Sequence, residues 1–186
     1  LAVAAPAVQI PTGTLADATA FNSVLKLKFT AGSDAAVNIT KLVVSRGGIF
    51  SDNNVKISVT DSTGKKHGGV IQVSADHTAE IGLSTDPIVV PKGGSEEVTF
   101  RATIAAITSA SGTLQFSLAS KDAVTSTATE VAGTFPITGS VFTVVDGASS
   151  IASATFDVRS LATATRSVDI GQKSYEMTKF EVIEGS

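Results

Sequence analysis

Short runs of alternating apolar and polar residues follow one another along almost the whole chain, separated by turns rich in Gly, Ser, Thr and Asp. In the run 23–30, Leu25, Leu27 and Phe29 fall on one face of an extended strand, and lysines fall on the other. Strands of this kind at regular spacing build a sandwich or a barrel. We predict strands at 23–30, 37–46, 54–60, 70–74, 78–83, 88–90, 97–107, 113–118, 134–138, 141–145, 154–158 and 175–183.

Irregularities in this pattern define the predicted organisation. The alternation slips between Ile39 and Leu42, which indicates a β-bulge. No segment carries a convincing helical stripe, and 121–130 is expected to be a loop or an edge strand. Pro6 and Pro11 cannot donate to a ladder, so the start of the chain is expected to be a linker or an edge strand. We therefore predict an N-terminal extension or linker over 1–20, a β-sandwich over 21–147 and a C-terminal extension with a late strand over 148–186.

Composition limits the classes of protein that fit this pattern. The chain is 42% hydrophobic and 17% charged, so it can bury a core. Its formal net charge is -3 and its Lys and Arg residues form no cluster, which argues against nucleic-acid binding. No apolar run is long enough to span a bilayer.

The compartment is inferred from the same composition. The absence of Cys excludes a disulfide scaffold and a Cys-based metal site. The chain begins at Leu1 and not at Met, from which we expect either a removed leader or a fragment. Low charge and abundant Ala, Ser, Thr, Gly and Val favour a secreted protein, so we expect an extracellular or cell-surface location.

Residues that usually carry chemistry are scarce. His67 and His77 are both expected in turns between strands, where the simplest interpretation is a solvated side chain. A structural zinc site needs three or four ligands, and the chain offers two His and no Cys. No Gly-x-Ser-x-Gly nucleophile elbow occurs. We therefore expect no catalytic residues, no cofactor and no enzymatic activity.

Two weaker candidate sites remain. Turn oxygens of Asp52, Asn54 and Asp61 are the types of ligand that calcium prefers, although their spacing is not that of a dedicated calcium loop. Turn Asp and Asn side chains also hydrogen-bond the backbone of their own turns, which is the competing interpretation. Asn38 begins an Asn-Ile-Thr sequence and is a candidate glycosylation acceptor, although such short patterns also arise by chance.

The late strand 175–183 points to assembly. Its end, 179–186, resembles 26–33 in its leading lysine, its alternation and its closing Gly-Ser. A single strand leaves its backbone groups unpaired unless a sheet edge accepts it. It either returns to its own sandwich, inserts into a neighbouring subunit, or begins a second domain; segment 2–10 is the alternative donor strand. The residues expected to carry self-assembly are Tyr175, Met177, Phe180, Val182 and Ile183.

The region 37–145 has a family resemblance that rests on four runs. They are NITKLVV (38–44), SDNNV (51–55), IVVPKGGS (88–95) and TFPITG (134–139). This region resembles the immunoglobulin-like modules of prokaryotic S-layer and other cell-surface proteins. The resemblance implies an antiparallel immunoglobulin-like β-sandwich, here with extra terminal strands. It also implies a structural surface role, often in tandem arrays or lattices, and no catalytic residues.

Two functions of different classes follow. The first is a structural subunit of an extracellular filament, pilus-like fibre or S-layer-type array, which forms homo-oligomers or polymers by strand exchange between subunits. The second is an adhesive or carbohydrate-binding module of a larger surface protein. Sugar-binding modules usually present Trp or Tyr platforms, and this chain has no Trp and a single Tyr at position 175.

Overall fold

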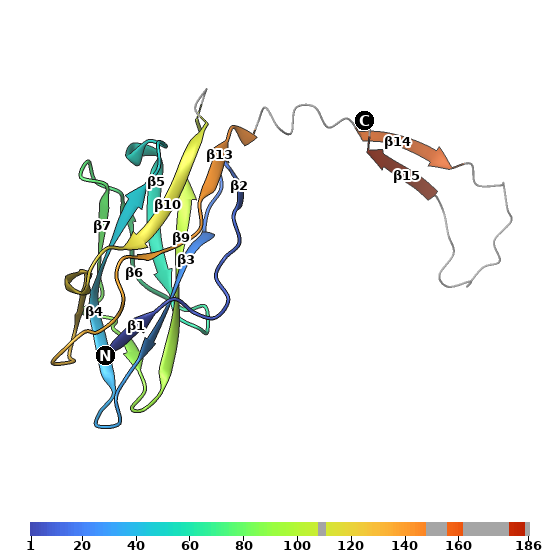
Figure 1. The fold of residues 1–186 in the computed structure, drawn as a ribbon. Coiled ribbons are helices and arrows are strands. Elements are labelled where there is room, and N and C mark those ends of the chain that lie inside the picture. The colour runs from blue at the N-terminus through green and yellow to red at the C-terminus, as the bar shows by residue number, and fades with distance from the viewer. Residues whose placement is uncertain (108–110, 148–155, 162–178, 185–186) are drawn as a thin grey trace, which may run out of the picture. The chain divides into compact units, whose positions relative to one another are not determined.

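The computed structural model describes residues 1–107, 111–147, 156–161 and 179–184 (Figure 1). The chain divides into two compact units, Leu1–Gly147 and Ala148–Ser186. The first unit is built from two β-sheets, as the alternating pattern predicts for a β-sandwich. Two short 3-10 helices accompany the strands, η1 (Asp52–Asn54) and η2 (Lys121–Ala123).

The first sheet contains five antiparallel strands in the order β1-β3-β9-β5-β6. Strands β3 and β9 form its longest pair, and β1 and β6 lie at its two edges (Figure 1). The bounds are β1 (Ala2–Ala4), β3 (Asn22–Thr30), β5 (Val55–Thr60), β6 (Lys66–Gln72) and β9 (Ser95–Ile104).

The second sheet contains eight strands around the path β11-β4-β10-β13-β2. Strands β7 and β8 also pair with β4, and β12 pairs with β10. Strand β2 runs parallel to β13, whereas the other pairs are antiparallel. The bounds are β2 (Gly13–Ala16), β4 (Val37–Gly47), β7 (Thr78–Gly82), β8 (Ile88–Val90), β10 (Gly112–Leu118), β11 (Val124–Ser126), β12 (Ile137–Thr138) and β13 (Phe142–Val145).

One apolar core is built from residues of both sheets. Leu25, Leu27 and Phe29 of β3 are fully buried, as the alternation of this strand predicts. Phe100 from β9 and Phe116 from β10 bring large side chains to the same core from the two sheets. Because alternate residues of a strand point to opposite faces, Lys26 and Lys28 of β3 lie on the other face and are half-buried.

The predicted bulge in β4 is confirmed by its pairing with β11. Lys41 and Ile39 oppose Thr125 and Ser126, so Thr40 is an extra residue on β4. The extra residue shifts the alternation of β4 by one position and keeps apolar residues buried on both sides of the bulge.

Several boundaries differ from those predicted. Residues 1–20, predicted as an extension or linker with an edge strand as the alternative for the start of the chain, contribute β1 and β2, each at the edge of its sheet. Strand β6 begins at Lys66 and not at residue 70, because the chain passes through Gly68, with φ +63°, without leaving the sheet. The segment 121–130, predicted as a loop or an edge strand, forms η2 and β11, and β11 is an edge strand. Only Ile137–Thr138 of the predicted strand 134–138 is a strand.

The second unit contains β14 (Phe156–Leu161) and β15 (Lys179–Glu184). These strands form a two-stranded antiparallel sheet in which Val158 lies opposite Val182. Phe180, Val182 and Ile183 of the predicted assembly strand therefore belong to β15. Tyr175 and Met177 lie outside the described residues.

Candidate functional site

The outer edge of β1 forms the start of a parallel strand pair. The backbone N–H of Val3 donates to the carbonyl of Ala132 at 2.8 Å, and the N–H of Ala132 donates to the carbonyl of Leu1 at 2.9 Å. The terminal amine of Leu1 donates to the carbonyl of Glu130 at 2.9 Å. Strand β1 is thus held by β3 on one side and by 130–132 on the other.

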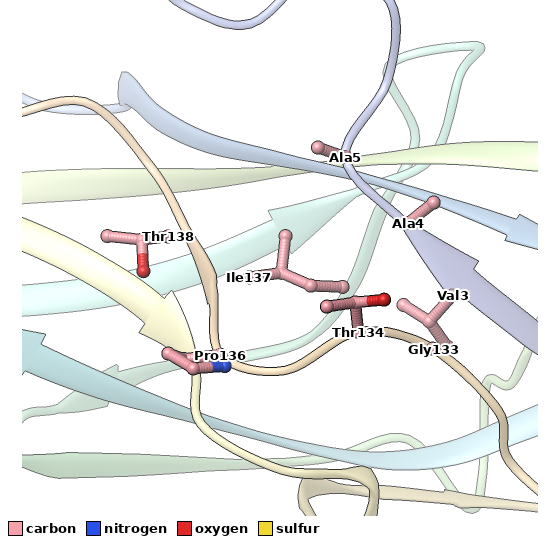
Figure 2. A pocket seen from close by; sticks show the side chains of 8 residues that line it. All are labelled: Val3, Ala4, Ala5, Gly133, Thr134, Pro136, Ile137 and Thr138. Atoms are coloured by element: carbon pink, nitrogen blue, oxygen red, sulfur yellow. The ribbon is translucent and has the colours of Figure 1, made fainter.

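This pair ends at Gly133, and a groove opens beside it. A Cβ atom at Gly133 would lie 2.5 Å from the carbonyl oxygen of Val3, so only glycine permits this approach. Beyond it, β1 and the segment 133–138 enclose a hollow of about 500 Å³ (Figure 2). The residues that line it are uncharged, namely Val3, Ala4, Ala5, Gly133, Thr134, Pro136, Ile137 and Thr138.

A second hollow of about 390 Å³ is lined by residues around the N-terminal end of β1. Ala2 and Ala132 line it, and Glu130 is the single charged side chain among its lining residues. Neither hollow has the convergent titratable side chains that acid–base chemistry requires.

His67 lies in β6 and is 4% exposed, so the expectation of a solvated turn histidine is wrong for this residue. Its Nε2 lies 3.1 Å from Oδ2 of Asp61, and its Nδ1 lies 3.0 Å from the carbonyl oxygen of Asp86. The early start of β6 places the ring between these two oxygens. His77 does lie in an exposed turn, where its side chain is 60% exposed.

Asp61 is held as a carboxylate by its neighbours. Partial burial acts to raise its pKa, but hydrogen bonds from the Thr63 hydroxyl, the His67 ring and the amides of Lys65 and Thr63 outweigh burial and lower the pKa to about 2. One carboxylate oxygen accepts from Thr63 and Lys65, and the other faces His67. Both oxygens of this calcium candidate are therefore engaged within the protein.

Asp52 is engaged by a buried arginine. Nε of Arg46 donates to its Oδ1 at 2.6 Å, and Nδ1 of His77 lies 2.6 Å from its Oδ2. The Arg46 side chain is 5% exposed and also donates to the carbonyl of Gly48. The guanidinium therefore supplies a positive charge next to this carboxylate.

The three calcium candidates do not come together. Asp52 and Asn54 form the two ends of η1, which precedes β5, whereas Asp61 follows the other end of β5. The backbone N–H of Asn54 donates to Ser51, and its carbonyl accepts from Ala105. Across the described ranges, no group of three or more His, Cys, Asp or Glu residues is placed to hold a metal ion.

The candidate glycosylation residue, Asn38, is half-buried on β4. Its backbone N–H donates to the Thr127 hydroxyl at 3.0 Å, and its carbonyl accepts from the Thr127 N–H at 2.9 Å. The acceptor sequence thus lies in a paired strand, opposite Val89 of β8. Its side chain is partly accessible, and glycosylation of Asn38 stays a prediction.

The comparisons with known proteins add no family. No family model matches the chain, and no curated protein shows significant sequence similarity to it. In the part of the chain that the structure describes, no helix has the length and apolar character needed to cross a membrane.

Proposed function

We propose that this protein is a non-enzymatic, extracellular structural subunit that assembles into a filament or surface array through β-strand exchange. The observation that carries the proposal is the sheet β14–β15. Among the described residues, no third strand pairs with either of its strands. An isolated two-stranded sheet is at best marginally stable in water, so this sheet needs a partner.

The architecture proposed for the first unit is immunoglobulin-like. In chain order, β1, β3, β4, β5, β9, β10 and β13 take the places of strands A to G. The order β1-β3-β9-β5 then corresponds to A-B-E-D in one sheet, and β4-β10-β13 corresponds to C-F-G in the other. This strand order supports the resemblance to surface modules drawn from sequence.

The proposed assembly contact is a strand added to a sheet edge. Unpaired N–H and C=O groups along β14 and β15 are satisfied when another strand pairs with them. A contact between the C-terminal unit of one subunit and the sandwich of the next is heterologous, so it propagates into a filament or a lattice. On the sandwich, the groove beside β1 offers a surface of uncharged side chains for such a contact.

Removal of the late strand tests this proposal. Electron microscopy of the native protein should show polymers. A chain lacking residues 174–186 should keep the melting temperature of the first unit and form none. A full-length Phe180→Asp, Val182→Asp variant should lose them as well. Lys179→Glu is the matched control, since it changes charge without removing an apolar residue. Polymers that persist in both the truncated chain and the double variant would refute the role of β15.

A further inference from the structure

The strand pair β14–β15 repeats the pairing of β1 with β3. In the first unit, Val3 lies opposite Phe29 in an antiparallel pair. In the second unit, Val158 lies opposite Val182, also in an antiparallel pair. Each pair is followed by Gly-Ser, at 32–33 after β3 and at 185–186 after β15.

The length of chain between the paired strands is similar. Between opposite residues, 25 residues separate Val3 from Phe29 (28 minus 3), and 23 residues separate Val158 from Val182 (181 minus 158). Antiparallel neighbours are usually joined by loops of two to five residues. A connection this long between paired strands is uncommon, so its recurrence with a similar length is informative.

The apolar positions match as well. Val3, Leu27 and Phe29 are buried in the first unit. Through the shared register, Val158 takes the place of Val3, whereas Phe180 and Val182 take those of Leu27 and Phe29. The pairing and the apolar pattern therefore agree, and the spacing differs by two residues.

The first unit shows what belongs on the second edge of β15. There, the edge of β3 that β1 leaves open is covered by β9, with Leu27 opposite Val98 and Lys28 opposite Glu97. In the second unit, no described strand occupies the corresponding edge of β15.

We propose that residues 156–184 are the first strand pair of a second sandwich with the architecture of the first. The free edge of β15 then binds an antiparallel strand of the β9 type, contributed by a copy of the sandwich region 34–147 that has no β1–β3 pair of its own, because β9 of a complete sandwich is already paired with β3 and β5. This inference specifies the partner of β15 and rests on the proposed function for its biological role. It gives β15 the place that β3 has in the first unit.

The test appends a copy of residues 34–147 after Ser186 of the full chain, so that Gly185-Ser186 takes the place of Gly32-Ser33. The chain has no Cys, so an engineered pair reports on one contact alone. We expect Glu181→Cys to form a disulfide with a Glu97→Cys substitution in the appended copy, read by mass spectrometry of non-reduced digests. Disulfides require Cα atoms within about 7 Å, so the bond reports the register.

The disulfide experiment has a positive control and a negative control. Lys28→Cys with Glu97→Cys in the first unit of the unmodified chain should form the equivalent disulfide, because those residues are opposite each other. Glu181→Cys with Arg101→Cys in the appended copy should not, because Arg101 lies four residues further along the strand. A second measurement is amide exchange at 180–183, which should slow at least tenfold when the copy is appended.

The inference would be overturned if the disulfide between positions 181 and 97 fails to form while the control disulfide between positions 28 and 97 forms. Equal disulfide yield from the Arg101→Cys pair, or unchanged amide exchange at 180–183, would overturn it as well. These outcomes are separable from failure of the proposed function. If the native chain polymerises although the disulfide fails to form, the proposed assembly role stands and the second sandwich does not. If the disulfide forms but the native chain never polymerises, the second sandwich stands and the assembly role does not.

Discussion

The carboxylate of Asp17 accepts a hydrogen bond from the backbone N–H of Gly147 at 2.7 Å, which joins the segment after β2 to the last residue of the first unit. Its other oxygen accepts from the N–H of Ile107 at 2.6 Å, and its own N–H donates to Val145. Asp17 is 7% exposed. The buried side chain of Asp17 thus hydrogen-bonds the end of the parallel pair β2–β13 and the region that follows β9.

Asp17→Asn should lower the melting temperature by a few degrees. The backbone N–H of Ile107, then that of Gly147, lowers the pKa of Asp17, whereas an amide has one acceptor oxygen for the two donors. Because the folded pKa lies below the ordinary 3.8, the difference between wild type and variant should be complete above about pH 4 and shrink as pH falls further. Asp34→Asn, in an exposed loop, is the control. Equal melting temperatures for all three proteins at pH 7 would contradict this role.

The contact between Asp61 and His67 predicts a second acid-sensitive contribution. The folded pKa of Asp61 is about 2 and its ordinary value is 3.8, so its stabilisation is present above about pH 4 and is lost as pH falls toward 2. Denaturant unfolding of wild type and Asp61→Ala should differ at pH 6 and converge near pH 2. Ser62→Ala, in the same turn, should follow wild type throughout. A difference that stays constant across this range would show that Asp61 acts only through neutral contacts.

Chelation should leave the melting temperature unchanged within about 1 °C, because a ligand that does not bind the native state cannot stabilise it. Asp52 is engaged by Arg46 and Asp61 by His67, so calcium would have to compete with these contacts for either carboxylate. Differential scanning calorimetry with EDTA and with millimolar calcium provides the measurement. A rise of several degrees on addition of calcium would contradict the expectation, and Asp52→Asn would then test that carboxylate as its ligand.

Arg46→Gln should cost roughly 3–5 kcal/mol of unfolding free energy, the range for removing one partner of a buried ion pair. The loss leaves the carboxylate of Asp52, whose side chain is 13% exposed, without its cation. Lys41→Gln is the matched control, since Lys41 forms an exposed pair with Glu80 that should contribute below about 1 kcal/mol. Urea unfolding gives both values, and equal costs would show that burial of the Arg46 pair is unimportant.

Gly48→Ala should destabilise the fold by more than the roughly 1–3 kcal/mol of backbone strain alone. Gly48 has φ +96°, and a Cβ there would lie 2.1 Å from the carbonyl oxygen of Thr113, which is backbone and cannot move aside. Gly64→Ala isolates the strain, because Gly64 has φ +86° and a Cβ at this position would meet no other atom within 4 Å. Similar melting temperatures for the two variants would show that the close approach to Thr113 is relieved without cost.

Alternation predicted most of the strands, because burial on one face of a strand leaves a period of two in the sequence. The bulge near Thr40 was predictable for the same reason, since an extra residue interrupts that period. His67 was misplaced because Gly68 and Gly69 indicate a turn, whereas the structure keeps them within β6. Nothing in the local sequence marks Asp17 as buried, because its partners are backbone amides from segments 90 and 130 residues away.

Local sequence is sufficient to predict an all-β chain with a buried apolar core and a late strand, because strand periodicity and composition are local properties. The folded structure settles which strands are neighbours. It made β2 a parallel partner of β13, placed Arg46 against Asp52, and set Val158 opposite Val182. These relationships depend on long-range pairing, where many registers satisfy the same alternation and packing of the whole sheet selects one.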